Sequence, residues 1–172
     1  MKRLAVLRHA KSSWDDPRLD DFDRPLNDRG RKAARLIGRE MNRRAMHFDL
    51  VLASTAVRVG ETIDHLQEEF RFTSEIRFEP PIYEASAGTL LELVQTEGGE
   101  SGSVLLVGHN PGLQQLLLDL TDRDVHGLRD GVKSKFPTAA LALVELPADR
   151  WSEVTRGSGQ IVELILPREL HE

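Results

Sequence analysis

The sequence predicts a single α/β domain, a three-layer sandwich in which helices flank a mostly parallel central sheet. Short apolar runs alternate with longer segments whose apolar residues recur at helical spacing through most of the chain. The length of 172 residues suits one domain with a substantial core. Because the chain contains no internal repeat, low-complexity tract or linker, we expect one domain over residues 1–172.

The first strand and first helix are predicted within residues 1–45. Residues 3–7 form an apolar run that is typical of a buried strand, and a polar, Asp-rich loop follows over residues 8–26. A helix is expected to start near Asn27 or Asp28, either of which can cap it. Its apolar face consists of Ala34, Ile37, Met41 and Ala45.

A second strand and helix are predicted from residue 48. Residues 48–53 form another buried strand, and Ser54 or Thr55 is expected to cap the helix that follows. The apolar face of that helix consists of Val59, Ile63, Leu66 and Phe70. Residues 76–78 alternate like a short strand, which the prolines at 80 and 81 end.

The middle of the chain repeats the pattern. Residues 89–97 predict a short helix, residues 98–102 a turn, and residues 104–107 a third buried strand. The next helix is expected to use Asn110 as its N-cap and Pro111 as its first residue. Its buried face consists of Leu113, Leu116, Leu117 and Leu120.

The last third predicts a charged loop and two strands. Residues 121–137 are expected to form a loop, either a mobile rim or a plain surface connection. Residues 139–146 and 160–166 predict the late strands, with a glycine-containing turn at residues 157–159.

Composition excludes several classes of function. The formal net charge of −5 gives no general reason to expect nucleic-acid binding. The absence of cysteine excludes disulfides, cysteine-zinc sites and thiol nucleophiles. No apolar run is long enough for a signal peptide or a membrane helix, so we expect a cytoplasmic protein without a membrane partner.

The charge is unevenly distributed. Residues 24–44 contain eight Lys or Arg residues but two Asp or Glu residues. A solvated helix face is the favoured interpretation, and a docking surface for an acidic partner is the alternative.

Cationic and polar side chains follow each of the three buried strands. Arg8 and His9 follow the first, Ser54 and Arg58 the second, and His109 the third. Because the carboxyl ends of parallel strands meet at one edge of a sheet, we expect these residues to converge. No sequence-adjacent carboxylate neutralises the two Arg and two His, so the cluster predicts an anion site.

Three stretches of sequence resemble the signatures of the histidine phosphatase superfamily, which includes the phosphoglycerate mutases. They are LRHA at residues 7–10, STAVRVGET at residues 54–62 and VGHNPG at residues 107–112. The small size and RPLNDRG at residues 24–30 resemble the compact bacterial phosphohistidine phosphatases of the SixA type. The resemblance covers residues 4 to about 166 and implies a phosphoglycerate mutase-like fold.

The resemblance implies a mechanism. His9 would be the nucleophile and would carry a phosphohistidine intermediate, while Arg8, Arg58 and His109 would hold the phosphoryl oxygens. Ser54 is a further candidate phosphate ligand, although helix capping explains it as well. The mechanism needs no metal and no cofactor, and we find no metal-binding motif in the sequence.

The general acid has several candidates. Glu84 stands where family members with a carboxylic acid place it, and a surface Glu in a loop is the alternative interpretation. Asp15 and Asp16 are further candidates. An imidazole leaves with little help, so a phosphohistidine substrate makes an acid dispensable.

Two loop residues bear on the pocket. The family usually has Gly where this chain has Ala10, which predicts ordinary backbone angles and a slightly narrower pocket floor. Ala at this position also occurs among the phosphohistidine-phosphatase-like members. Trp14 is expected to be a packed loop aromatic, with a platform at the pocket rim as the alternative.

The expected function is a metal-independent phosphatase that acts through His9 on phosphohistidine in a protein, because the short chain lacks room for large caps. One alternative is a phosphatase of a small phosphoester such as a sugar phosphate or nucleotide. The other is a non-catalytic phospho-binding module. The sequence specifies no oligomeric state.

Overall fold

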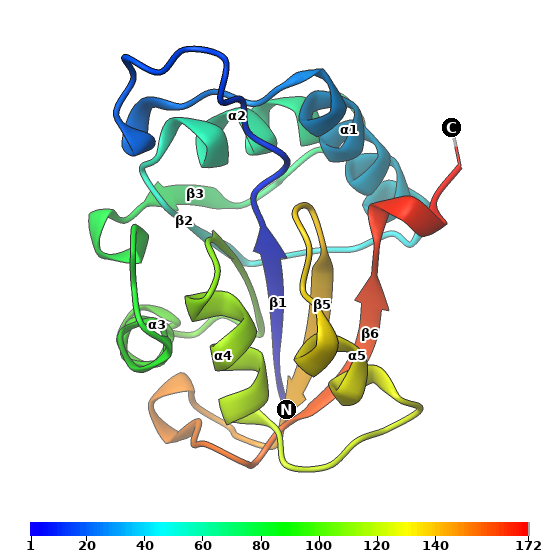
Figure 1. Cartoon of the computed structure of the whole chain (residues 1–172). Coiled ribbons are helices and arrows are strands. Elements are labelled where there is room, and N and C mark those ends of the chain that lie inside the picture. Colours follow the sequence, from blue (N-terminus) through cyan, green and yellow to red (C-terminus); the bar gives the residue numbers. More distant parts are fainter. Residues whose placement is uncertain (172) are drawn as a thin grey trace.

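The fold is built on a six-stranded mixed sheet with the strand order β3-β2-β4-β1-β5-β6 (Figure 1). The computed structural model describes residues 1–171. Strands β3, β2, β4 and β1 are mutually parallel, β5 is antiparallel to β1, and β6 is antiparallel to β5. The strands are β1 (Lys2–Arg8), β2 (Leu50–Ala53), β3 (Glu75–Phe78), β4 (Ser103–Gly108), β5 (Leu141–Leu146) and β6 (Gln160–Ile165).

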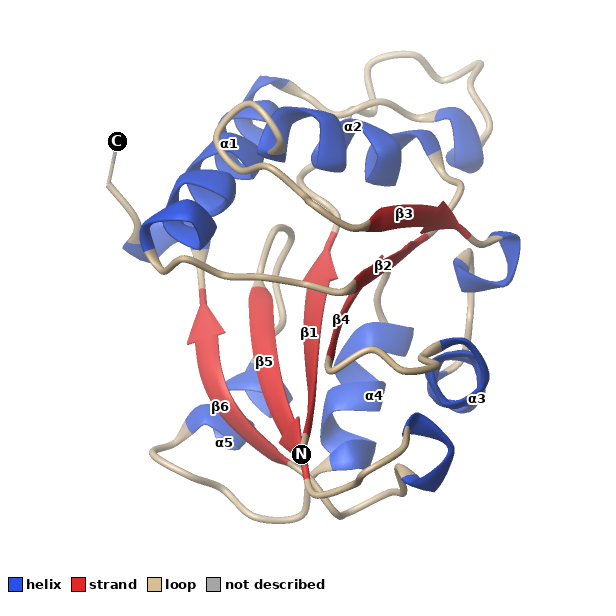
Figure 2. Ribbon diagram, turned by 180° about the vertical axis from the view of Figure 1, so that it is seen from behind, coloured by secondary structure: helices blue, strands red, loops and turns tan. Residues whose placement is uncertain are grey.

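Helices cover both faces of the sheet, which confirms the predicted three-layer sandwich. Helices α1 and α2 lie on one face, and α3, α4 and α5 lie on the other (Figures 1 and 2). The helices are α1 (Asp28–Arg43), α2 (Val57–Leu66), α3 (Ala87–Glu97), α4 (Gly112–Leu120) and α5 (Leu128–Ser134). Within residues 1–171, no helix is long and apolar enough to span a membrane.

The central strands are buried on both sides. In β1, Leu4 and Val6 pack in the cluster that contains α3, α4 and α5, whereas Ala5 and Leu7 pack in the cluster under α1 and α2. Successive side chains of a strand point to opposite faces, so a sheet with two covered faces requires a continuous apolar run. This requirement explains the uninterrupted apolar segments in the sequence.

The start of α1 confirms the predicted cap, but its end is shorter than expected. Asn27 Oδ1 accepts a hydrogen bond from the backbone N–H of Gly30 at 2.8 Å. A Cβ at Gly30 would overlap the carbonyl oxygen of Lys11, so glycine allows the helix to pack closely on the loop after β1. Ala45 was wrongly assigned to the apolar face, because α1 ends at Arg43 and Ala45 is exposed with a φ of 53°.

The starts of α2 and α4 both lie slightly later than predicted. The N-cap of α2 is Ala56, although the Ser54 hydroxyl accepts a hydrogen bond from the Ala56 N–H at 3.2 Å. In α4 the N-cap is Pro111 instead of Asn110, whose side-chain oxygen accepts from the Gln114 N–H at 3.2 Å. In both cases the polar side chain binds an N–H group near the helix start without being the N-cap.

Residues 121–137 were wrongly predicted to be a loop. The segment contains α5, and its Val132 and Phe136 are fully buried against the sheet. The two glycines at 127 and 131 favoured the loop interpretation, whereas burial of two large apolar side chains stabilises the helical turn. The segment that follows α5 lies beside the carboxyl end of β1, where the Phe136 carbonyl accepts from Arg8 and the Ala139 N–H donates to the Arg8 carbonyl.

Candidate active site

The predicted cationic residues lie together at the carboxyl ends of the parallel strands. Arg8 ends β1 and His9 follows it, while His109 follows β4. The ring centroids of His9 and His109 lie 5.3 Å apart. Arg58, in the first turn of α2, places its guanidinium 3.3 Å from His109 Nδ1. The convergence of these four side chains at this edge of the sheet is therefore the one that the sequence predicts.

The backbone on both sides of His9 is fixed by hydrogen bonds. The His9 N–H donates to the carbonyl of Gly108 at 3.1 Å, and its carbonyl accepts from the Ala139 N–H at 3.0 Å. The next residue, Ala10, donates its N–H to Thr62 Oγ1 at 2.9 Å. The backbone that carries the imidazole is therefore held by β4, by the chain leading into β5, and by α2.

The hydrogen bonding of His9 determines its tautomer. Nδ1 lies 2.7 Å from the carbonyl oxygen of Ala10, which can only accept, so Nδ1 carries the proton. Burial lowers the pKa of His9 to about 3, and the Arg58 charge adds to this effect while the Ala10 hydrogen bond opposes it. His9 is therefore neutral at pH 7, with an unprotonated Nε2.

Arg8 is oriented by a backbone carbonyl. Its Nη1 donates to the Phe136 carbonyl at 3.2 Å, and the same oxygen accepts from Asn110 Nδ2 at 2.8 Å. Burial and the Arg58 charge both lower the pKa of Arg8. Among the described residues, its buried Nε has no hydrogen-bond partner.

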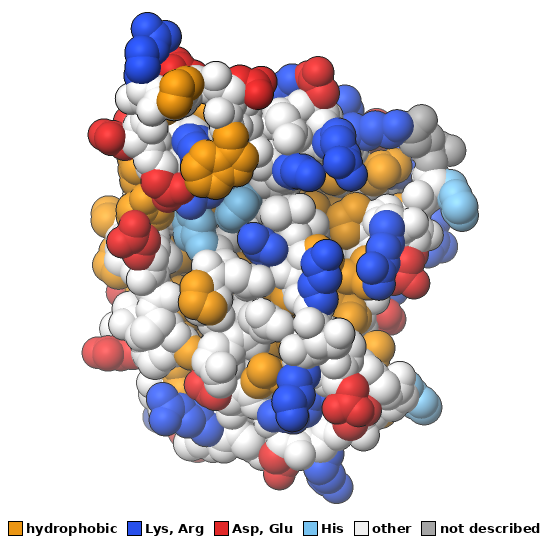
Figure 3. Space-filling view, viewed as in Figure 1, with side chains coloured by type: hydrophobic (Ala, Val, Ile, Leu, Met, Phe, Trp, Pro, Cys, Tyr) orange, Lys and Arg blue, Asp and Glu red, His pale blue; other side chains and the backbone are white. Residues whose placement is uncertain are grey.

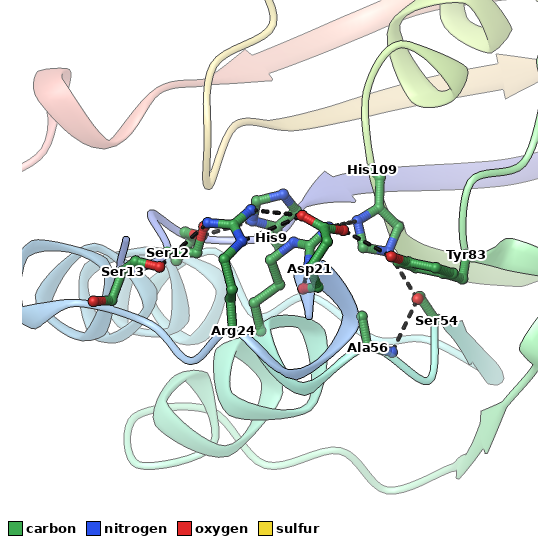
Figure 4. A network of polar contacts seen from close by, with 11 residues as sticks. His9, Ser12, Ser13, Asp21, Arg24, Ser54, Ala56, Tyr83 and His109 are labelled. Carbon is green, nitrogen blue, oxygen red and sulfur yellow. Dashed lines mark hydrogen bonds and ion pairs between the residues drawn. The ribbon is translucent and has the colours of Figure 1, made fainter. Parts of the chain in front are cut away.

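A carboxylate that the sequence analysis did not foresee neutralises Arg58. Arg58 Nη1 donates to the backbone oxygen of Asp21 at 2.7 Å, and Nη2 donates to Asp21 Oδ2 at 3.0 Å. The same carboxylate accepts from the Tyr83 hydroxyl at 2.7 Å and from Arg24 Nη2 at 3.0 Å (Figure 4). The sequence has no adjacent carboxylate that balances the cations, but Asp21, 37 residues from Arg58 in the chain, balances the charge of Arg58.

These contacts keep Asp21 ionised. The hydrogen bond from Tyr83 contributes most, and with the two guanidiniums it lowers the pKa of Asp21 to about 2. Tyr83 responds in the opposite direction, because burial and its bond to Asp21 raise its pKa to about 12. Asp21 thus places a negative charge on the donors of Arg58, where an anionic ligand would bind.

His109 is neutral and points its two nitrogens in opposite directions. A guanidinium can only donate, so His109 Nδ1 accepts from Arg58, and Nε2–H donates to Ser54 Oγ at 2.8 Å. Burial and the Arg58 charge lower the pKa of His109 to about 4. Ser54 is fully buried, with its hydroxyl between His109 and the Ala56 N–H. Ser54 therefore orients the His109 imidazole by accepting the hydrogen bond from Nε2–H.

Glu84 is the one candidate acid that borders the site. It lines a cavity of about 670 Å³ together with Asp21, Arg58, Tyr83 and His109. Its backbone is left-handed, with a φ of 58°, and the residue is exposed.

The two further candidate acids do not line that cavity. Asp15 is exposed, and Asp16 accepts hydrogen bonds from Arg18, which lower its pKa. A lowered pKa disfavours Asp16 as a proton donor at neutral pH.

The loop after β1 confirms one expectation and overturns another. Ala10 has no positive φ, which confirms the predicted backbone, and it is fully buried in the hydrophobic cluster under α1 and α2. Trp14 is 75% exposed, so the packed-aromatic prediction was wrong. The Arg24 guanidinium lies 3.5 Å from the centroid of the Trp14 ring, and this contact holds the indole at the surface.

Several residues that shape the site escaped sequence reasoning. Asp21 lies among five aspartates between residues 15 and 23, and no local pattern distinguishes it. Tyr83 immediately precedes Glu84, so its place beside the candidate acid was the available signal. The Phe136 carbonyl is a backbone group and leaves no trace in the residue types.

Comparison with known proteins gives one family. The model of the histidine phosphatase superfamily (branch 1) matches residues 4–98. A Mycobacterium tuberculosis protein of uncharacterised function is 32% identical over 165 residues, which cover 94% of this chain and 100% of that protein. An uncharacterised chloroplastic protein of Arabidopsis thaliana is 29% identical over 92% of this chain and 72% of its own length.

Solved structures give the same fold. The crystal structure of an Agrobacterium tumefaciens protein assigned as a SixA phosphohistidine phosphatase superposes with a TM-score of 0.81 at 31% identity, covering 96% of this chain and 98% of that one. A structure of the protein histidine phosphatase SixA gives a TM-score of 0.78 at 21% identity, covering 97% and 98% of the two chains.

Proposed function

The chain belongs to the histidine phosphatase superfamily, and from this we propose that it is a phosphatase that transfers the phosphoryl group of a protein phosphohistidine to His9 and then to water. The observation that carries the proposal is the state of His9. Its Nδ1–H is fixed on the Ala10 carbonyl, so the neutral imidazole has an unprotonated Nε2, and the positive charges of Arg58 and Arg8 act on this ring.

The phosphoryl group would enter where Asp21 now holds Arg58. Arg8 and Arg58 each have a buried Nε without a hydrogen-bond partner among the described residues. Displacement of the Asp21 carboxylate would free Nη2 of Arg58, whereas Nη1 donates to the backbone oxygen of Asp21. Two guanidiniums would then bind the equatorial oxygens and stabilise the charge of an in-line transition state.

The reaction has two steps. His9 Nε2 forms a bond to phosphorus as the bond from phosphorus to the substrate imidazole breaks, and that imidazole takes its proton from solvent. Water then attacks the phosphorus of phospho-His9, which releases inorganic phosphate and a proton and restores Nε2. Both steps use side chains of this chain and water.

Phosphohistidine is the substrate that the site favours. Imidazole is a good leaving group, and Glu84, the one carboxyl group besides Asp21 that lines the cavity, is exposed to solvent. The A. tumefaciens relative, at 31% identity, is assigned to the phosphohistidine phosphatases and supports the same class.

The test is phosphate release from a phosphohistidine-bearing carrier protein and from an aryl phosphate. Wild type should act on the carrier and leave acid-labile phosphate on His9, whereas His9→Ala should do neither. His171→Ala is the matched control, because His171 is exposed and distant from the site in the chain. Tight phosphate binding without turnover of either substrate would instead indicate a phospho-binding module.

A small phosphoester is the second candidate substrate, and the cavity of about 670 Å³ beside Arg58 and His109 is the observation that favours it. An ester needs protonation of its leaving oxygen, and Glu84 lines that cavity. Glu84→Gln should therefore abolish turnover of a sugar phosphate, whose alkoxide is a poor leaving group, and spare turnover of phosphohistidine. Equal loss of both activities would contradict this division of roles.

A further inference from the structure

A second concave surface lies beside the candidate active site. This basic groove has a volume of about 450 Å³ and is formed where α1, the segment after α5 and the end of β6 meet. All five of its charged residues are cations, namely Lys11, Arg29, Lys32, Lys135 and Arg168. The cation-rich helix noted in the sequence contributes two of them.

Four of the five cations of the groove lack a carboxylate partner among the residues that the structure describes. Within residues 1–171, Lys11, Arg29, Lys135 and Arg168 form no ion pair with a carboxylate. The acidic neighbour of Arg29 in sequence is Asp28, which pairs with Arg31. The resulting excess of positive charge favours an anionic partner.

The basic groove adjoins the nucleophile. Lys11 follows His9 by two residues, and Pro137 and Thr138 line the groove immediately before Ala139, whose N–H binds the His9 carbonyl. Lys and Arg side chains gather on the molecular face that also exposes histidine atoms (Figure 3). These cations are therefore near the path by which a phosphorylated residue would reach His9.

The opposite side of the site lacks this excess of positive charge. There, the cavity beside Arg58 is lined by Asp21 and Glu84. A continuous polyanion such as a nucleic-acid strand would cross both sides and meet these carboxylates. A folded protein carries patches of either sign and can place acidic residues on one side of its phosphorylated residue alone.

We propose that the basic groove docks a cluster of Asp and Glu side chains that lies next to the phosphorylated residue of a protein substrate. The inference rests on the proposed function for the identity of that residue, whereas the groove itself is a feature of this chain. The main effects of such docking are to raise the association rate and to orient the substrate. The contact area that it adds is small.

The first experiment measures docking without chemistry. The probe is a fluorescent, unphosphorylated peptide with a central His flanked on one side by four Glu, compared with a peptide that has four Gln. Wild type should bind the Glu peptide about tenfold more tightly, and 0.5 M salt should remove the preference. Equal affinities at low salt, or preference for a random-sequence single-stranded oligonucleotide over the Glu peptide, would overturn the proposal.

The variants locate the preference. Lys135→Glu with Arg168→Glu should abolish it, and the neutral pair Lys135→Gln with Arg168→Gln should reduce it. The matched control is Arg123→Glu with Arg150→Glu, because both residues are exposed. Arg123 follows the end of α4, and Arg150 follows the end of β5, which pairs with the start of β1. A loss of preference as large in the control as in the groove variant would show a general charge effect and refute docking at the groove.

Turnover separates this inference from the proposed function. With phosphorylated versions of both peptides, wild type should show a kcat/KM ratio of about ten in favour of the Glu peptide, and the groove variant a ratio near one. Turnover of both peptides at equal rates would overturn the docking proposal and leave the phosphatase proposal intact. Selective binding of the Glu peptide without any turnover would leave the docking proposal intact and overturn the phosphatase proposal.

Discussion

Replacing Asp21 with Asn tests whether this carboxylate competes with the ligand of Arg58. The lowering of the Asp21 pKa from 3.8 to about 2 corresponds to about 2.5 kcal/mol in favour of the ionised group. Because the side chain is 46% exposed, solvent screening reduces the usable part to about 1 kcal/mol. Asp21→Asn should therefore bind inorganic phosphate about fivefold more tightly, since the phosphate no longer displaces a charged competitor.

The measurement is the inhibition constant of inorganic phosphate at pH 7, with chemical denaturation in parallel. The variant should lose about 1 kcal/mol of unfolding free energy at pH 7. Because the folded pKa of Asp21 is depressed, this stability is present above about pH 4 and lost as the pH falls toward 2. Wild type and variant should therefore converge in acid. Weaker phosphate binding by Asp21→Asn would refute the competition and make Asp21 a positioning residue for Arg58.

The remaining predictions concern protonation and packing. As the pH falls from 6.5 toward 3, the unfolding free energy should decrease, because the unfolded chain protonates His9 and His109 at a higher pH than the folded chain does. Urea titrations of the double variant His9→Asn with His109→Asn should show a smaller decrease. Gly30→Ala should destabilise the fold by about 2–4 kcal/mol, because the new Cβ would overlap the backbone of Lys11. Gly60→Ala in α2 should be neutral or stabilising by up to about 1 kcal/mol, because no atom lies near the new Cβ. Equal melting temperatures for the two variants would contradict this prediction. Thr62→Val should cost about 1–3 kcal/mol by orphaning a buried N–H and should lower kcat, and Thr62→Ser should restore both.

The parts of the fold that were predictable are those in which burial alone determines the residue types. The doubly covered strands β1, β2 and β4 must be apolar throughout, so their positions are visible in the sequence. The cationic residues after these strands were predictable for a related reason. Parallel strands place their carboxyl ends at one edge, so Arg8, Arg58 and His109 had to converge.

The parts that were not predictable depend on tertiary contacts. Helix α5 is short and mostly polar, and it is stable because Val132 packs on the sheet. Asp21 reaches Arg58 across 37 residues of sequence, and its selection among five aspartates is made by the path of the loop. Ser54 and Asn110 were recognised as residues near helix starts, but their partners, the imidazole of His109 and the Phe136 carbonyl, belong to other segments.

The pairing of β1 with β5 limits which fragments of the chain can function. All three signature stretches lie before residue 113, yet Lys2–Leu7 pair along their full length with residues 141–146. A fragment ending at residue 120 would keep every signature residue and leave β1 as an open edge strand. It would also lack the Phe136 carbonyl and the Ala139 N–H that orient Arg8 and His9. A complete set of signatures in a shortened relative is thus no guarantee of a complete site.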